Sequence, residues 1–276
     1  MQFNHSTPIA LTIAGSDSSG GAGIQADLKT FSANDVYGAS VITAVTAQNT
    51  LCVSAVHPIP ISIVVAQISS VLNDLDVQAI KIGMLFSPAL VKAVAESIKD
   101  FKGIVVLDPV MIAKSGDILL QQSAVDALLS ELIPYVDLLT PNYPEAEVLL
   151  GLQTNTIEDK KPSLQEYAKA MLSLGPKHVL LKGGHGNKDV CSDILVGQNL
   201  NTSIFEAPRI ATKNTHGTGC TYSSSITAHL AKGYTMEKAV EMSHTYLHQA
   251  IMNADTLQVG KGHGPVHHFY KSWHTK

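Results

Sequence analysis

The chain has 276 residues, of which 45% are hydrophobic and only 15% are charged, so a disordered protein is excluded and a large buried core is expected. A formal net charge of −4 and a single arginine, Arg209, offer no basic surface for a nucleic-acid backbone, and we expect no nucleic-acid partner. The longest apolar runs, such as residues 9–14, are far shorter than the roughly 18 residues of a membrane span. The start lacks the features of a secretory signal, and the widely spaced Cys52, Cys191 and Cys220 do not indicate a disulfide framework, so a cytoplasmic protein without a membrane partner is expected.

Short runs of β-branched and other apolar residues alternate with longer amphipathic stretches along the chain. This alternation is typical of βαβ units, in which helices cover both faces of a parallel sheet. We therefore predict an α/β fold with a mostly parallel central sheet, built as one domain over residues 1–276. In chain order, the predicted elements are a strand at 9–14, a helix at 24–34, a strand at 40–47, a helix at 62–75, a strand at 79–82, a helix at 88–99, a strand at 104–107, a helix at 123–132, a strand at 138–139, helices at 144–149 and 163–174, a strand at 178–181, an antiparallel edge hairpin at 193–196 and 202–205, and helices at 218–231 and 236–253.

Local signals support several of these boundaries. Pro88 and Pro144 stand where the first turn of a helix accepts proline, and Gly233 suits the position just after a helix. The polar stretch 153–161 resembles a linker, but because the βαβ pattern resumes beyond it, we interpret it as a surface loop.

Ligands of open parallel sheets bind beyond the carboxyl ends of the strands, so the residues after each predicted strand are the candidates for a site. The first candidate is the glycine-rich segment 15–23, which follows the first strand and precedes a helix. Its glycines allow the backbone to approach a ligand closely, and the helix start behind them favours an anion or a polar ring. Asp27, one turn into that helix, is expected to face the loop, while the alternative is an ordinary turn with a solvated aspartate.

This segment does not match the common nucleotide motifs fully. The two residues after Gly20 are not the lysine and serine or threonine that a Walker A loop requires. The pattern Gly21-x-Gly23-x-x-Ala26 matches the dinucleotide fingerprint, but Gln48 and Asn49 occupy the region where that motif carries an acidic residue. An NAD-dependent oxidoreductase is therefore a remote alternative.

The second candidate segment, 213–220, precedes a predicted helix. Small residues at a helix start direct several amides to one point, so Gly217, Thr218 and Gly219 are predicted to form an anion hole for a transferring phosphoryl group. The helix dipole is expected to lower the pKa of the Cys220 thiol, which could then act as a base toward an attacking hydroxyl. The alternative is a glycine-rich turn with an inert buried cysteine.

Other strand ends carry charged or amide side chains. Asn142 and Glu145 have a spacing that suits Mg²⁺ held through water, although Glu145 is equally explained as a first-turn acid that complements the helix dipole. Asp108 ends the most apolar strand, where its burial would call for a metal ion or a lysine nearby. Lys182 is the candidate cation for nucleotide phosphates, and a solvated strand-end lysine is the alternative.

The histidines do not have the spacing of a known metal motif. We therefore predict no metal site at His185, His216 or His244, and we expect His267 and His268 to be surface residues.

Taken together, these segments resemble the ribokinase-like superfamily and, within it, the hydroxymethylpyrimidine and phosphomethylpyrimidine kinases of thiamine biosynthesis. The resemblance covers nearly the whole chain and implies a single ribokinase-like domain with a three-layer α/β/α sandwich. The segments that carry it are AGSDSSGGAGIQADLK at 14–29, TAVTAQNT at 43–50, KIGML at 81–85, DPVM at 108–111, TPNYPE at 140–145, KGGH at 182–185, HGTGC at 216–220 and GHGPVHH at 262–268.

The resemblance implies ATP-dependent phosphorylation of 4-amino-5-hydroxymethyl-2-methylpyrimidine and then of its monophosphate. The implied cofactors are ATP and Mg²⁺, and a requirement for K⁺ is left open. The substrate residues implied are Gly15, Asp27, Gln48, Met84 and Val110. The implied nucleotide contacts are Lys182, Asn142, Glu145, Thr215 and Gly219, the implied metal ligands are Asp108 and Glu145, and the implied catalytic groups are Cys220, Lys182, Gly217, Thr218 and Gly219.

One departure from the superfamily favours the pyrimidine branch. Aspartate is the usual base at the position of Cys220, whereas the pyrimidine kinases carry cysteine there. A pyridoxal or pyridoxine kinase, which shares the scaffold, is the nearest alternative, and Gln48 together with Met84 favours the pyrimidine. A non-catalytic protein that binds the pyrimidine is a further alternative. The resemblance also implies a homodimer.

Overall fold

A sheet of mostly parallel strands runs through the middle of the molecule. The computed structural model describes residues 7–111, 122–152, 163–184 and 189–273. Its strands are β1 (Ile9–Asp17), β2 (Tyr37–Gln48), β3 (Val53–Pro58), β4 (Ala79–Ile82), β5 (Ile104–Leu107), β6 (Leu138–Leu139), β7 (His178–Leu181), β8 (Val190–Gly197) and β9 (Thr202–Pro208). They lie in the order β3-β2-β1-β4-β5-β6-β7-β8-β9, in which the strands from β2 to β7 are parallel and β3, β8 and β9 are antiparallel to their neighbours.

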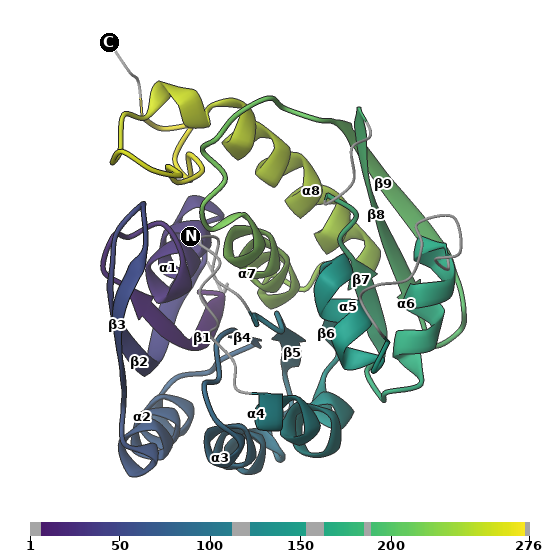
Figure 1. The fold of residues 1–276 in the computed structure, drawn as a ribbon. Coiled ribbons are helices and arrows are strands. Elements are labelled where there is room, and N and C mark those ends of the chain that lie inside the picture. Colours follow the sequence, from purple (N-terminus) through teal and green to yellow (C-terminus); the bar gives the residue numbers. More distant parts are fainter. Residues whose placement is uncertain (1–6, 112–121, 153–162, 185–188, 274–276) are drawn as a thin grey trace, which may run out of the picture.

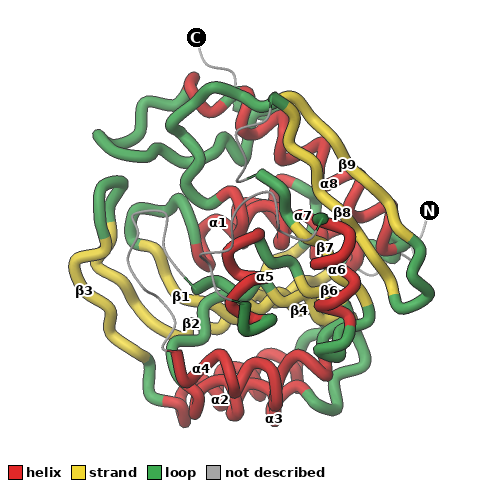
Figure 2. The backbone as a smooth tube through the Cα atoms, turned by 45° about the vertical axis from the view of Figure 1, so that its right-hand side comes forward, coloured by secondary structure: helices red, strands yellow, loops and turns green. Residues whose placement is uncertain are grey.

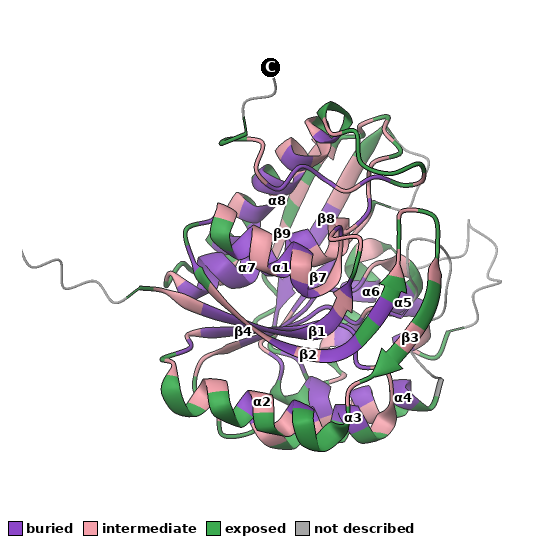
Figure 3. Ribbon diagram, turned by 90° about the vertical axis from the view of Figure 1, so that its left-hand side faces the viewer, coloured by how far each residue is buried: buried purple, intermediate pink, exposed green. Residues whose placement is uncertain are grey.

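Helices cover both faces of this sheet (Figures 1 and 3). The helices are α1 (Gly23–Ala33), α2 (Ile61–Asp74), α3 (Pro88–Ile98), α4 (Gln122–Ala127), α5 (Tyr143–Leu149), α6 (Leu164–Leu172), α7 (Thr218–Ala231) and α8 (Met236–Met252). Buried side chains of α2 to α6 pack in one cluster against one face, and those of α1, α7 and α8 pack in a second cluster against the other. The predicted α/β/α sandwich is therefore confirmed.

Strand periodicity divides the buried residues between the two clusters. In β5, Val105 and Leu107 join the cluster of α2 to α6, whereas Val106 joins that of α1, α7 and α8. In β4, Ala79 faces α1 and α7, so the residue two positions on, Lys81, is placed on that same side. The backbone therefore directs a lysine into the space between the sheet and the helices that carry the glycine-rich loops.

The predicted central strands are confirmed, and four of them, at 79–82, 104–107, 138–139 and 178–181, have the predicted ends. The antiparallel hairpin at one edge is also confirmed, as β8 and β9. The sequence did not predict β3. This edge strand is largely exposed and ends in proline, so it lacks the apolar run that marks a buried strand.

The helices agree with the prediction to within one or two residues at most boundaries. The main difference is in 123–132, where α4 ends at Ala127 and a π-helix, Leu128–Leu132, continues it. Gly233 has a φ of +84° just after α7, as its predicted role requires. The loop predicted at 153–161 lies outside the described residues. No helix in the described ranges has the length and apolarity needed to cross a membrane.

The strand order identifies where a ligand should bind. The chain passes from β1 to β2 on one side and later returns to β4 on the other side of β1. Such a topological switch point opens a crevice at the carboxyl ends of the strands. Figure 2 shows the turn between β2 and β3 beside the segment that follows α8, and the His263 amide donates to the Thr50 carbonyl at 3.0 Å. This C-terminal segment therefore lies along one side of the crevice.

Candidate active site

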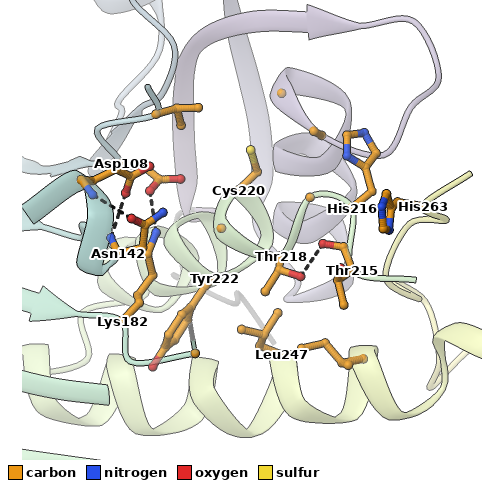
Figure 4. A pocket seen from close by; sticks show the side chains of 18 of the residues that line it. Asp108, Asn142, Lys182, Thr215, His216, Thr218, Cys220, Tyr222, Leu247 and His263 are labelled. Atoms are coloured by element: carbon orange, nitrogen blue, oxygen red, sulfur yellow. Dashed lines mark hydrogen bonds and ion pairs between the residues drawn. The ribbon is translucent and has the colours of Figure 1, made fainter. Parts of the chain in front are cut away.

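A cavity of about 820 Å³ lies at these strand ends and is lined by residues from every candidate segment of the sequence analysis. Side chains from the strand ends, the start of α7 and α8 converge on it (Figure 4). Among the predicted site residues, those that line the cavity are Gly15, Gln48, Met84, Asp108, Val110, Asn142, Glu145, Lys182, Thr215, Gly217, Thr218, Gly219 and Cys220.

Asp27 is the exception, and its predicted position is wrong. Its side chain is fully buried beneath the cavity and does not line it. Both carboxylate oxygens accept hydrogen bonds from Lys81, at 2.9 and 3.0 Å, and the hydroxyls of Thr12 and Ser224 donate to them at 2.6 Å each. Asp27 lies on the face of α1 that packs against the sheet. Its carboxylate therefore points to β4 and α7 and not to the glycine-rich loop. It has no lone pair directed at a ligand in the cavity.

The Asp27 carboxylate compensates a lysine that would otherwise be costly to bury. Lys81 is also fully buried, and burial alone would lower its pKa. Nearby negative charge, mainly that of Asp27, together with the hydrogen bond to Asp27 outweighs burial and holds the pKa of Lys81 above its ordinary value, so the ammonium stays charged. Lys81 reaches the floor of the cavity, whereas its partner does not.

Asp17 organises the glycine-rich loop from within. Its carboxylate accepts hydrogen bonds from the amides of Ser19, Gly21 and Ala22 at 2.8 to 3.1 Å and from His216 Nε2 at 2.7 Å. Burial would raise the pKa of this carboxyl, but the hydrogen bonds from His216 and Ser19 outweigh it and lower the pKa to about 2. Asp17 is therefore ionised, and His216 must carry its hydrogen on Nε2.

A second group of polar and charged side chains lies at three adjacent strand ends. Asp108 follows β5, Asn142 follows β6, and Lys182 follows β7, and the backbone segments of Asn142 and Lys182 continue to pair beyond the strands. Lys182 Nζ lies 2.8 Å from Asp108 Oδ1, which also accepts from the Thr140 hydroxyl at 3.3 Å. The sequence predicts a metal ion or a lysine beside a buried Asp108, and Lys182 is that lysine.

Glu145 is an acid in the first turn of α5, as one of the two interpretations left open by the sequence predicts, and its part in holding Mg²⁺ stays a prediction. It forms a capping box with Asn142 at the start of α5, in which each side chain accepts from the backbone amide of the other. It also lines the cavity beside Asp108 and Lys182. Burial and the nearby Asp108 carboxylate raise the Glu145 pKa to about 7, although Lys182 opposes this.

The start of α7 lies directly against this group. A Cβ added at Gly219 would lie 3.4 Å from Asp108 Oδ2 and 3.5 Å from Lys182 Nζ. The Thr218 amide donates to the Thr215 carbonyl at 3.3 Å, so it is turned away from the anion hole that the sequence assigned to it. The amides of Gly219 and Cys220, in the same first turn, have no hydrogen-bond acceptor among the described residues. These two amides, with Lys182 beside them, make the better anion site.

The pKa predicted for Cys220 is wrong in direction. Burial raises the pKa of the thiol to about 11, and the carboxylates of Asp27 and Asp108 add to this, while Lys81 opposes it. The effect of the helix dipole is smaller than that of burial between two carboxylates. In this site Cys220 is a neutral thiol.

This protonation state predicts how Cys220 reacts with iodoacetamide, which attacks the thiolate. The alkylation rate at Cys220 should keep rising beyond pH 10, because the fraction of thiolate increases up to its pKa of about 11. The rate can be followed by mass spectrometry of the Cys220 peptide. A cysteine in a short unstructured peptide, with a thiol pKa of about 8.5, serves as the control. A Cys220 rate that levels off below pH 9 would contradict the raised pKa.

The histidines separate into two groups. His267 and His268, expected on the surface, are buried, at 2% and 5% exposure, and burial lowers the pKa of His268 to about 3. His216 and His244 line the cavity, and His185 lies outside the described residues. Within the described ranges, histidine, cysteine and acidic side chains form no cluster of three or more suited to a metal ion.

Three residues that line the cavity, Asp17, Lys81 and His216, were not among the site residues predicted from the sequence. Asp17 and His216 each stand inside a segment that was singled out for its glycines, but their contact joins positions 199 residues apart. The signal available for Lys81 was a charged residue inside an otherwise apolar strand, which indicates a buried partner.

The comparisons with known proteins agree on the family. The model of the phosphomethylpyrimidine kinase family matches residues 17–267. The chain is 49% identical to the hydroxymethylpyrimidine/phosphomethylpyrimidine kinase of Rhizobium meliloti (strain 1021), over 97% of this chain and 99% of that one. It is 48% identical to the protein of that name from Escherichia coli (strain K12), over 96% and 98%.

Solved structures give the same fold. Phosphomethylpyrimidine kinase from Clostridium difficile 630 superposes with a TM-score of 0.75 at 45% identity, over 88% of this chain and 99% of that one. An ADP complex of Bacillus subtilis pyridoxal kinase superposes with a TM-score of 0.85 at 35% identity, over 95% and 98%. The resemblance inferred from the sequence segments is confirmed, and the chain belongs to the phosphomethylpyrimidine kinase family.

Proposed function

We propose that the chain transfers the γ-phosphoryl group of ATP to the hydroxymethyl group of 4-amino-5-hydroxymethyl-2-methylpyrimidine and then to the phosphate of the product. The observation that carries the proposal is that one cavity gathers two sets of residues, Gln48 with Met84 and Lys182 with the first-turn amides of α7. We assign the first set to a pyrimidine end, which would take the polar ring, and the second set to a phosphate end, which would take the phosphoryl donor. The relatives named above carry the two kinase activities in their names.

The pyrimidine end offers an apolar wall and one oriented amide. Gly15 and Met84 touch, since a Cβ added at Gly15 would lie 2.6 Å from Met84 Cε. The Thr46 hydroxyl donates to the Ser16 carbonyl at 2.7 Å and lies 3.1 Å from Gln48 Oε1. The Gln48 oxygen is therefore directed to Thr46, and its NH₂ group is left to donate to a ring nitrogen of an aminopyrimidine.

The phosphate end supplies positive charge where the transferred group would lie. In the transfer, a bond forms between the substrate oxygen and the γ-phosphorus as the bond to ADP breaks. Lys182 and the amides of Gly219 and Cys220 stabilise the charge on the moving group. Cys220 lines the cavity in the same first turn, and because a neutral thiol cannot take the proton of the attacking hydroxyl, a role as base would require its thiolate and stays a prediction.

The donor set beside Lys182 fits a divalent cation. Asp108 and Glu145 are two buried carboxylates next to one lysine, and burial, with a smaller contribution from Asp108, raises the pKa of Glu145. Carboxylate and phosphate oxygens are the ligands that Mg²⁺ prefers. Asp108 and Glu145 would hold the ion, which when bound neutralises charge on the nucleotide phosphates.

A pyridoxal kinase is the second candidate, because pyridoxal kinases from two bacteria superpose with TM-scores of 0.85. The Staphylococcus aureus protein was solved with AMP-PCP and pyridoxal, at 32% identity to this chain. Identity to the pyrimidine kinases is higher, at 42% to 49%. Membership in a kinase family leaves the NAD-dependent alternative without support.

Product identification tests the proposed function. Incubation with MgATP and the hydroxymethylpyrimidine should give the monophosphate first and then the diphosphate, each resolved by mass spectrometry, with one ADP formed for each phosphoryl group transferred. Pyridoxal in a parallel incubation should be phosphorylated more slowly at equal enzyme concentration. Faster turnover of pyridoxal, or release of ADP without a phosphorylated pyrimidine, would contradict the proposal.

The homodimer, the cytoplasmic location and any need for K⁺ stay predictions. Light scattering of the purified protein would test the first against the monomer mass of 29.4 kDa. Omission of K⁺ from the product assay would test the last.

A further inference from the structure

Two loops that are far apart in the sequence interlock beside the cavity. His216 Nε2 donates to Asp17 Oδ2 at 2.7 Å, and both side chains are almost fully buried. A Cβ added at Gly21 would lie 2.3 Å from His216 Cδ2, and one added at Gly217 would lie 1.8 Å from the Gly21 carbonyl oxygen. The backbones of the two loops therefore touch, with the imidazole packed on Gly21 and its Nε2 bound to Asp17.

Asp17 lies near the pyrimidine end of the cavity, and His216 lies near the phosphate end. Asp17 lies two residues after Gly15, at the pyrimidine end, and its carboxylate also binds the amides of Gly21 and Ala22. His216 directly precedes Gly217, at the start of α7 and the phosphate end. The contact thus spans the boundary between the proposed acceptor and donor sites.

We propose that Asp17 and His216 form a positioning pair, which fixes the pyrimidine loop against the start of α7 so that the acceptor hydroxyl and the phosphoryl group meet in reactive geometry. This inference rests on the proposed function. Phosphoryl transfer depends mainly on positioning and charge stabilisation, and a displacement of about 1 Å can lower the rate about 100-fold.

The backbone of His216 is held independently of its side chain. Its amide donates to the Gly264 carbonyl at 3.0 Å, and its carbonyl accepts from the Val266 amide at 3.3 Å. Loss of the imidazole therefore leaves the start of α7 in place and releases the glycine-rich loop from it. This predicts a loss of alignment between two sites that each stay formed.

The test compares His216→Leu with His216→Gln, whose side-chain nitrogen is as many bonds from Cα as Nε2 of histidine. In His216→Leu, kcat for the pyrimidine should fall about 10 to 100-fold, while the Kd of a non-hydrolysable ATP analogue changes less than about threefold. His216→Gln should recover at least about tenfold of the lost kcat, because it restores the donor to Asp17. Equal kcat values in the two variants would overturn the proposal, as would a loss of nucleotide binding that parallels the loss of kcat.

Thr221→Val is the matched control. It removes the buried contact at 3.0 Å between Thr221 and His268 near the same helix start, without touching the glycine-rich loop. It should lower the melting temperature about as much as His216→Leu does and leave kcat unchanged. If Thr221→Val lowers kcat equally, the effect is one of stability and the proposal is wrong.

Asp17→Asn gives a second route if His216→Leu does not fold. Asp17→Asn should lower kcat. The kcat of the double variant should be no lower than that of the less active single variant, because both substitutions disrupt the same Asp17–His216 contact. Additive losses would overturn the proposal. A wild-type protein that does not phosphorylate the pyrimidine refutes the proposed function itself, whereas an active wild type with an equally active His216→Leu variant refutes the positioning pair alone.

Discussion

Replacement of Lys182 by alanine is expected to lower kcat for the pyrimidine about 10² to 10³-fold, the range observed when one charge-stabilising group is removed from an active site. Lys182 is the cation beside the first-turn amides of α7, with its Nζ 2.8 Å from Asp108 and close to Gly219. Negative charge is redistributed over the phosphoryl oxygens and the leaving ADP in the transition state, so loss of the ammonium should affect kcat more than the binding of the pyrimidine.

The measurement is steady-state kinetics at a temperature well below the melting transition, since the change also leaves the Asp108 carboxylate without its partner. Lys182→Arg, which keeps the positive charge, should retain more activity than the alanine variant. Lys177→Ala is the matched control from the other end of the same strand, where the lysine is 65% exposed and pairs with Asp137. A kcat of Lys182→Ala within threefold of the wild-type value would show that Lys182 does not stabilise the transferred group.

Replacement of Lys81 by methionine is expected to lower the free energy of unfolding by about 3 to 5 kcal/mol, because it leaves the buried Asp27 carboxylate without a compensating charge. Both side chains are fully buried, and the carboxylate is surrounded by β1, β4 and α7. Urea denaturation followed by circular dichroism at 222 nm measures the change.

The double variant Asp27→Asn with Lys81→Met should recover most of this loss. It removes both charges, and the asparagine oxygen still accepts from Thr12 or Ser224. Lys177→Met, which breaks an exposed pair, should cost no more than about 1 kcal/mol. A double variant as unstable as Lys81→Met alone would show that shape, and not charge, accounts for the loss.

The layered fold could be predicted because its signals are local. The apolar runs at Ile104–Leu107 and His178–Leu181 are buried on both faces, so their composition alone marks them as central strands. Strand β3 could not be found in the same way, since an exposed edge strand is defined by its hydrogen bonds to β2 and not by its own composition.

Most residues of the cavity could be predicted because parallel strands end at one edge of the sheet. Asp108, Asn142 and Lys182 each follow a strand in the sequence, and their strands are neighbours in the sheet. Topology therefore brings them together without any specific contact having to be foreseen.

The sequence by itself determined the order of strands and helices, the glycines at the two helix starts and the strand ends that carry Asp108 and Lys182, since periodicity and chain order express these directly. Only the tertiary structure decided which groups face each other. Packing turned Asp27 toward Lys81, placed the half-buried Cys220 near two carboxylates and paired Asp17 with His216. The reason is that burial and electrostatic neighbours depend on distances in space, and a side chain's chemistry is set by those distances rather than by its position in the chain.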